Sequence, residues 1–160
     1  MSTFQSDRYQ WRETYFVLFE SSRRPTLDQV RQTLAAIPNH FQITDVQADD
    51  QGRFESLTIL SPDDFAALDV SYLAGDEVVE QCMALADEFK PSESVDSTKL
   101  ARLVSLDARF DVMHFEQLAD APPEEESDEM LDPSALLVVL EALIELTGGV
   151  GVDPQSGSLL

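Results

Sequence analysis

The chain has 160 residues, of which 43% are hydrophobic, so it can bury the core of one ordinary domain and does not have the composition of a disordered chain. Its 31 acidic residues against 10 Lys and Arg give a formal net charge of −21, and a field of that sign repels nucleic acid and anionic lipid surfaces. We therefore expect neither a nucleic-acid ligand nor a membrane, and the single cysteine excludes an internal disulfide.

The sequence also gives an expectation about location. It does not open with a basic segment followed by a continuous apolar one, so we expect no signal peptide. The longest apolar stretch, within 135–146, is shorter than the roughly 20 residues that a membrane span needs. The sequence therefore predicts a cytoplasmic protein.

The first part of the chain predicts an arm, a strand and a helix. Residues 1–13 are polar with isolated aromatics, which predicts a flexible N-terminal arm before a single domain over 14–160. The segment 15–19 (YFVLF) is rich in aromatic and β-branched residues and predicts a strand. Thr26 is a good N-cap for the apolar residues at helical spacing that follow it, and Pro38 ends the predicted helix.

The middle of the chain predicts three strands and two helices. Strands are expected near 41–45, 54–60 and 66–72, and the turn sequence between the first two predicts a hairpin. A helix carrying apolar residues up to Phe89 is expected to begin at Gly75-Asp76, and a short helix is expected over 98–104 after a polar loop.

The last part predicts a strand over 110–115, an acidic mobile loop over 119–131 and a long apolar helix. Asp132 and Pro133 form a typical helix start, and ten of the twelve residues that follow from 135 to 146 are hydrophobic. A helix of this kind is buried on most sides, either in the middle of the fold or under a partner subunit. A last short strand is expected near 150–152, and a turn over 153–157 follows it.

This order of elements, β-α-β-β-β-α-α-β-α-β, predicts an α+β fold with a mixed, mainly antiparallel sheet and helices packed on one face. Most strands after the first helix lie in hairpins, which favours this class over a doubly wound parallel sheet. A ferredoxin-like core is the best single topology. The segments around the first and last helices also resemble each other faintly, as two related β-α-β halves or by coincidence.

No standard catalytic or nucleotide-binding motif is present in the sequence. Two histidines and one cysteine are too few for a zinc site built from soft ligands. The acidic run at 124–132 could collect Ca²⁺ or Mg²⁺, but it lacks the central glycine and the alternating ligands of an EF-hand, and a solvated loop explains it equally. We therefore expect no catalytic residue, no metal and no cofactor.

Two groups of polar residues could still bind a ligand. Arg23 and Arg24 precede a helix N-terminus, where they could grip a phosphate or carboxylate, or simply offset nearby acids. His114 and Glu116 point to the same face of a predicted strand, so they could form an acid–base pair, or His114 could be a hydrogen-bonded core residue. The candidate ligand-binding residues, all near strand ends, are Glu20, Arg23, Arg24, His114 and Glu116.

The sequence favours a small acidic, non-enzymatic protein-interaction or adaptor domain. The apolar last helix predicts a homodimer, with Leu136, Val139, Leu140 and Leu143 as the interface, and the acidic surface predicts a basic protein partner. One alternative is a small ligand-binding domain or enzyme with an anion site near Arg23. A second alternative is an acidic DNA mimic that inhibits a basic protein.

Overall fold

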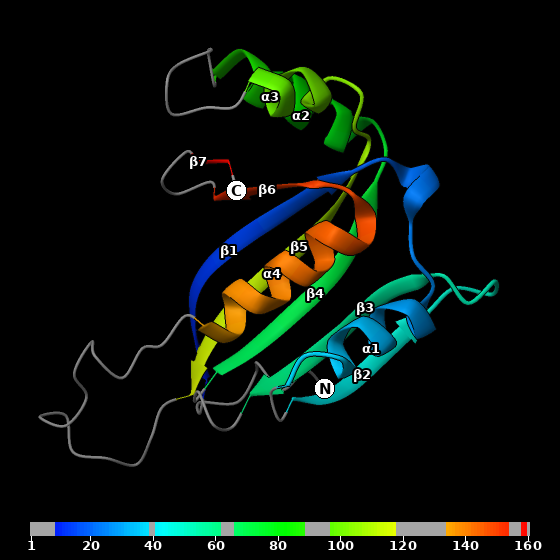
Figure 1. Ribbon diagram of the computed structural model, residues 1–160, viewed down its shortest axis with the longest axis vertical. Coiled ribbons are helices and arrows are strands. Elements are labelled where there is room, and N and C mark those ends of the chain that lie inside the picture. The colour runs from blue at the N-terminus through cyan, green and yellow to red at the C-terminus, as the bar shows by residue number, and fades with distance from the viewer. Residues whose placement is uncertain are drawn as a thin grey trace, which may run out of the picture.

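The computed structural model describes residues 9–38, 41–61, 66–88, 97–117, 134–153 and 158–159 (Figure 1). Its strands are β1 (Tyr9–Phe19), β2 (Gln42–Ala48), β3 (Phe54–Ser61), β4 (Ala66–Ala74), β5 (Ala108–Gln117), β6 (Val150–Asp153) and β7 (Ser158–Leu159). Its helices are the 3-10 turn η2 (Ser21–Arg23), α1 (Leu27–Ala35), α2 (Asp76–Glu88), α3 (Ser97–Leu103) and α4 (Ser134–Thr147). The predicted acidic loop at 119–131 lies outside the described residues.

The seven strands form one antiparallel sheet in the order β2-β3-β4-β5-β1-β6-β7, which confirms the α+β class and the mainly antiparallel sheet. The long strands β1 and β5 pair from Tyr9↔Gln117 to Phe19↔Ala108. Because β1 begins at Tyr9, residues 9–13 belong to the strand rather than to the arm expected over 1–13.

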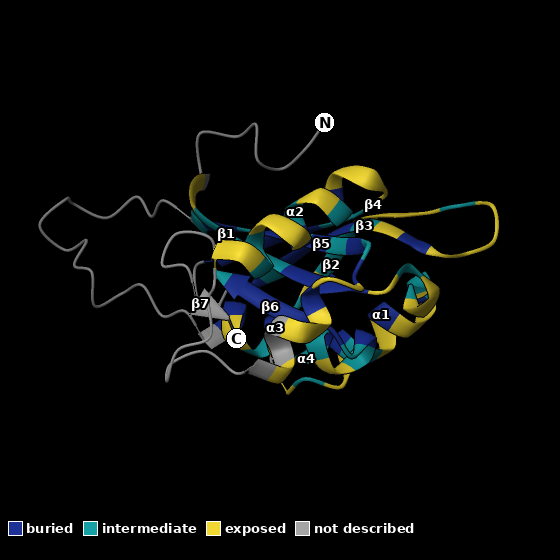
Figure 2. Cartoon of the chain, turned by 90° about the horizontal axis from the view of Figure 1, so that it is seen from above, coloured by how far each residue is buried: buried dark blue, intermediate teal, exposed yellow. Residues whose placement is uncertain are grey.

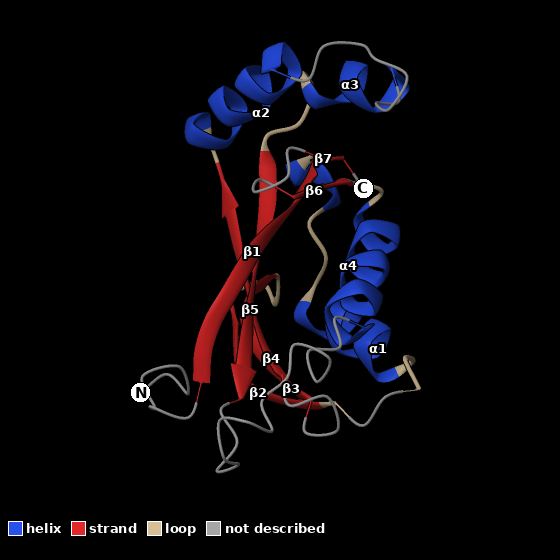
Figure 3. Ribbon diagram, turned by 90° about the vertical axis from the view of Figure 1, so that its left-hand side faces the viewer, coloured by secondary structure: helices blue, strands red, loops and turns tan. Residues whose placement is uncertain are grey.

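One face of the sheet is covered by α1 and α4, which lie side by side along it (Figures 1 and 3). Figure 2 shows buried residues in the sheet and on these two helices. The core beneath them is built around three fully buried rings, with the Phe110 centroid 4.7 Å from Phe19 and 5.3 Å from Phe54. Close packing of large apolar groups here supplies most of the hydrophobic stabilisation of the sheet.

Helices α2 and α3 do not join that layer. They lie across the end of the sheet (Figure 3), where they bury Leu18 and Val150, whose side chains are on the opposite face from those of Val17 and Phe19. The expectation that all helices pack on one face therefore holds for α1 and α4 only. The physical reason is that β1 carries apolar side chains on both faces at its C-terminal end. Both faces are therefore buried by helices.

Local signals at the helix ends agree with the sequence. The Thr26 side chain accepts a hydrogen bond from the Gln29 backbone, and the Gln29 side chain accepts one from the Thr26 backbone, which forms a capping box at the start of α1. At the other end of the chain, α4 stops before Gly148, whose φ of 65° suits glycine and few other residues. No helix among the described residues has the length and apolar character needed to cross a membrane.

Candidate interaction surface

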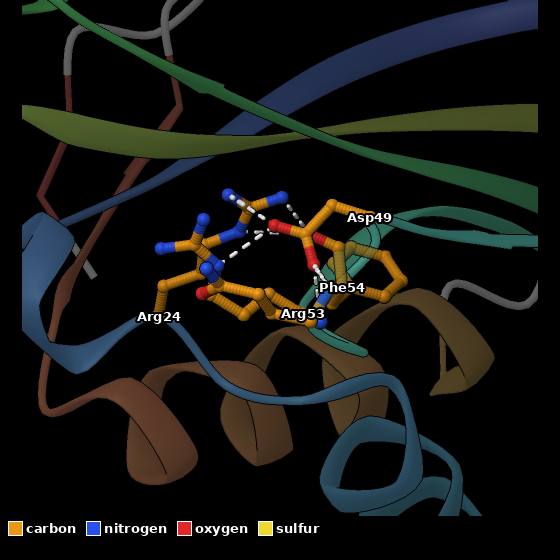
Figure 4. Close-up of polar contacts among 5 residues, drawn as sticks. Arg24, Asp49, Arg53 and Phe54 are labelled. Carbon is orange, nitrogen blue, oxygen red and sulfur yellow. Dashed lines mark hydrogen bonds and ion pairs between the residues drawn. The ribbon is translucent and has the colours of Figure 1, made fainter.

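The sequence-predicted arginines lie in the turn after β1, and Arg24 is fully engaged there (Figure 4). Its Nε and Nη2 donate hydrogen bonds of 3.0 and 2.7 Å to the carbonyl oxygen of Phe54. Its Nη1 lies 3.6 Å from Oδ2 of Asp49, and its guanidinium carbon lies 3.9 Å from the centre of the Tyr72 ring. These contacts occupy the guanidinium donors that an anion would need. Arg24 therefore stabilises the packing of the turn against the β2–β3 hairpin.

Arg23 and Glu20 flank that turn at the surface. Arg23 is exposed and its guanidinium lies against Gly148, while Arg102 donates a hydrogen bond to the carbonyl oxygen of Gly148. Two cations at the C-terminus of α4 interact favourably with the dipole of that helix. Glu20 is exposed at the edge of an open pocket of about 450 Å³.

Asp107 organises the floor of this pocket. Its carboxylate accepts hydrogen bonds of 2.7 Å from both the backbone N–H and the hydroxyl of Ser21. The hydrogen bond from the backbone N–H of Ser21 has the larger effect and the one from its hydroxyl the next. Together they hold the pKa of Asp107 below its usual value. The pocket is therefore polar and acidic, and it offers no cation placed to hold an anion.

His114 and Glu116 lie elsewhere on the sheet. His114, near the end of β5, pairs with Glu13 of β1. Ala108, at the start of β5, pairs with Phe19 of β1, which lies just before the arginine turn. Six strand residues separate His114 from Ala108, which is roughly 20 Å. The five candidate ligand-binding residues therefore form two separate groups at opposite ends of β5.

His114 is 5% exposed on the covered face, as a core histidine would be. Its Nδ1 lies 3.5 Å from Oε1 of Glu13 and has no hydrogen-bond partner, while Arg12 lies 3.4 Å from Glu116. Burial lowers the pKa of His114 more than the nearby Glu13 carboxylate raises it. A buried imidazole held in its neutral form has no open path to a substrate in the part of the chain that the structure describes.

The four residues expected at a dimer interface lie inside the chain. They share the inward side of α4 and are each at most 1% exposed: Leu136, Val139, Leu140 and Leu143. The apolar character of α4 therefore serves this chain's own core, and these side chains are not free to contact a partner subunit. The more exposed apolar groove between α1 and α4 has a volume of about 610 Å³ and is lined partly by Ala36, Ile37, Val138 and Ala142.

The other face of the sheet carries fewer described helices, although Ala67, Thr58 and Phe115 on it are buried. Below α2, no described helix packs on the side of β3, β4, β5 and β1 that faces away from α1 and α4 (Figure 3). We call this side the open face. Its side chains form three rows across the strands, given by the strand register as Leu60–Ala67–Phe115–Trp11, Thr58–Asp69–Met113–Thr14 and Ser56–Ser71–Asp111–Phe16.

The first of these rows is apolar, and we call it the apolar row. It ends at Trp11, which is 47% exposed and donates a hydrogen bond of 3.0 Å from Nε1 to the hydroxyl of Thr14. Ala67 and Phe115, which stand between Leu60 and Trp11, are 0% and 8% exposed, so Trp11 is the exposed end of the row. An exposed tryptophan beside other apolar groups is typical of protein-binding surfaces.

The middle row contains an acid without a partner. Asp69 is half-buried on β4 and makes no hydrogen bond or ion pair with any described residue. Burial, and to a lesser degree the charge of Asp45 on β2, raises the pKa of Asp69 above its usual value. By contrast, Asp111 in the next row is paired with Arg109 at 2.6 Å. Asp69 is therefore the carboxylate of this face that an external cation would stabilise most.

Sequence reasoning did not find this surface. Trp11 stands in a polar segment that was expected to be an arm, and Asp69 was expected only as one residue of the strand near 66–72. The alternation of 66–72 did predict that Asp69 and Ser71 share a face of a strand, which is the signal from which this face could have been found.

Comparisons of this chain with protein-family models, with curated proteins and with solved structures give no match. Among the described residues, no three His, Cys, Asp or Glu side chains are grouped as a metal site would require. The one cysteine, Cys82, is on the buried side of α2, and burial raises the pKa of its thiol to about 11. The inference of function therefore rests on the surfaces of the molecule.

Proposed function

We propose that this chain is a non-enzymatic protein-interaction domain that binds a partner protein on its open face. The observation that supports this proposal is the asymmetry of the sheet. One face is covered by α1 and α4, whereas the other presents a 47% exposed Trp11 beside apolar and hydroxyl side chains and has no described helix over its lower part. Such a surface, aromatic at one end and polar around it, has the anatomy of a protein interface.

The nucleophile and base candidates support a non-enzymatic role. Cys82 is buried with a raised pKa, and His114 is buried with a lowered one, so neither is both reactive and accessible. In the arginine turn, which was the candidate anion site, Arg24 is engaged with the carbonyl oxygen of Phe54, while Arg23 is exposed beside Gly148. A homodimer remains a prediction from the sequence, and it would need a surface other than the buried side of α4.

We also propose that the central part of the sheet is a ferredoxin-like core. The elements β1, α1, β4, β5, α4 and β6 follow the β-α-β-β-α-β order of that fold, and both helices cover one face. In this arrangement the β2–β3 hairpin and the α2–α3 pair are additions to the core. Folds of this kind leave one sheet face without helices, which agrees with an interaction role for the open face.

Display selection on the full chain tests the proposed function. Peptides would be selected against the native chain and then compared on Met113→Glu, which changes the centre of the open face, and on Leu137→Glu, which changes a 47% exposed side chain of α4 on the other side. We expect the selected peptides to lose binding to the first variant only, with both variants folded by circular dichroism. Peptides that bind both variants equally would contradict the proposal.

A further inference from the structure

We propose that Arg23 and Arg102 together bind a phosphate group at the C-terminal end of α4. The inference goes beyond the proposed function, because α4 packs on the covered side of the sheet and the site does not use the open face. It assigns a ligand class to Arg23, the exposed arginine of the turn after β1.

The first observation is that two guanidinium groups meet at Gly148, the residue that follows α4. Arg102, on α3, donates a hydrogen bond to the carbonyl oxygen of Gly148. The guanidinium carbon of Arg23 lies 3.5 Å from the point where a Cβ at position 148 would be, and that Cβ would collide with the guanidinium. Glycine therefore provides the room that Arg23 occupies as well as the φ of 65°. Both cations are placed by the same backbone residue.

The second observation is that neither arginine has an acid of its own in the described part of the chain. Other described arginines form ion pairs with Asp or Glu at 2.6 to 3.6 Å: Arg12, Arg24, Arg53 and Arg109. Arg23 and Arg102 are both exposed, and neither forms an ion pair with a described residue. A guanidinium has five N–H donors, so most of the donors of this pair are free for an external anion.

The third observation concerns the end of α4, which is capped without these arginines. The carbonyl oxygen of Leu143 accepts a hydrogen bond of 2.8 Å from the Thr147 hydroxyl, and that of Ile144 accepts one of 3.1 Å from the backbone N–H of Gly149. The last turn is thus closed by its own residues and by the backbone that follows it. The helix dipole makes two cations favourable here, but it does not use their N–H donors.

Charge and geometry select phosphate among the anions. Two guanidinium groups carry two positive charges, and each presents a planar fork of N–H donors. A phosphate monoester carries about −1.5 to −2 at pH 7 and three acceptor oxygens, so it can accept from both forks, whereas a carboxylate offers one charge and two oxygens. The net charge of −21 repels anions at long range, but salt screens this repulsion beyond about 10 Å at 0.1 M. Contact with the two arginines therefore decides binding.

Titration of the full chain at pH 7 and constant ionic strength tests the site. The probes are inorganic phosphate, acetate, a short peptide with one phosphoserine, and the same peptide with Glu at that position. Binding is followed by the NMR signals of the arginine Nε–H groups and by calorimetry. The variants are Arg23→Gln and Arg102→Gln, and the charge-matched control is Arg31→Gln, which changes an exposed arginine of α1.

We expect phosphate and the phosphoserine peptide to shift the signals of Arg23 and Arg102. Each of the two variants should weaken this binding at least about tenfold, and Arg31→Gln should change it by about twofold or less. Gly148→Ala keeps both arginines but displaces the guanidinium of Arg23, so it should weaken binding as well. Circular dichroism confirms that each variant is folded.

Every other outcome has a defined meaning. If Arg31→Gln weakens binding as much as Arg23→Gln does, the attraction is to net charge and the site is wrong. If acetate and the Glu peptide bind as tightly as the phosphate probes, the ligand class is wrong. If neither phosphate probe shifts the two arginine signals, the inference is overturned. Tighter binding of the phosphoserine peptide than of inorganic phosphate would support a phosphorylated protein as the source, and the reverse would support a small phosphate ligand.

Discussion

The two faces of the sheet are built from the same strands and differ in what covers them. On β5, Phe110 and Val112 point toward α1 and α4 and are fully buried, while Asp111 and Met113, which alternate with them, point the other way and stay partly exposed. The covered face contains interlocked aromatic rings, and the open face carries hydroxyls, acids and Trp11. The comparison indicates that stability is concentrated on one face, which leaves the side chains of the other free to be selected for recognition.

The largest predicted effect comes from breaking the covered face. Leu140 is 1% exposed on the inward side of α4. We expect Leu140→Ala to lower the free energy of unfolding by about 2–5 kcal/mol, because it leaves a cavity, and Leu140→Glu to prevent folding, because it buries a charge without a partner. Urea unfolding followed by circular dichroism measures the first, and light scattering with circular dichroism examines the second.

The same helix provides the control. Leu137 is 47% exposed, so Leu137→Ala should change the free energy of unfolding by only about 0.5 kcal/mol or less. If Leu140→Glu instead gave a folded monomer from a native dimer, α4 would be an interface after all, and its burial within one chain would not describe the protein in solution.

Local patterns were sufficient to predict most of the elements. Thr26 with Gln29 marks the start of α1, and the proline at 133 with Gly148 brackets α4 within a residue or two, because caps and stops act within a few residues of the chain. The strands near 41–45 and 66–72 were also found from alternation, and the strand over 54–60 from the turn that precedes it.

The sequence alone does not predict the order of the strands in the sheet. It therefore does not predict which residues come together on the candidate surface. The placement of β1 between β5 and β6 depends on contacts between residues about 100 positions apart, which leave no local pattern. Pairing with β5 also extends β1 back to Tyr9, through a segment whose polar residues hid the strand, and this brings Trp11 onto the open face. The separation of His114 from Arg23 follows from the same register.

A smaller effect is expected where the covered face meets the arginine turn. Arg24→Ala removes two hydrogen bonds to the carbonyl oxygen of Phe54 and the stacking on Tyr72, so we expect it to cost about 1–3 kcal/mol. Arg24→Lys should recover only part of this, because an ammonium group cannot reproduce the two-pronged contact. Arg31→Ala, on the exposed side of α1, is the charge-matched control and should be nearly neutral in urea unfolding.

The buried histidine of the covered face should make stability depend on pH. Because burial lowers the pKa of His114 below its usual 6.5, the unfolded chain takes up this proton first as the pH falls. Stability should therefore decrease from about pH 6.5 downward and stop decreasing, for this group, below the folded pKa. Urea midpoints between pH 8 and 5 should fall for the native chain and fall less for His114→Gln; equal slopes would show that His114 does not carry the dependence.

The smallest predicted effect has the opposite sign and sits on the open face. Asp69 has a pKa raised above the usual 3.8 by burial and by Asp45, so the folded state holds this proton longer than the unfolded chain does. The protonated form of Asp69 contributes stability below about pH 3.8, and this contribution is lost as the pH rises through the folded pKa. At neutral pH the charged form therefore lowers the free energy of unfolding. Asp69→Asn should therefore raise stability at pH 7, by about 0.5 kcal/mol or less, in urea unfolding. Glu141→Gln, which changes an exposed acid of α4, should leave stability nearly unchanged. An Asp69→Asn chain that loses stability at pH 7 would mean instead that this acid supports the fold.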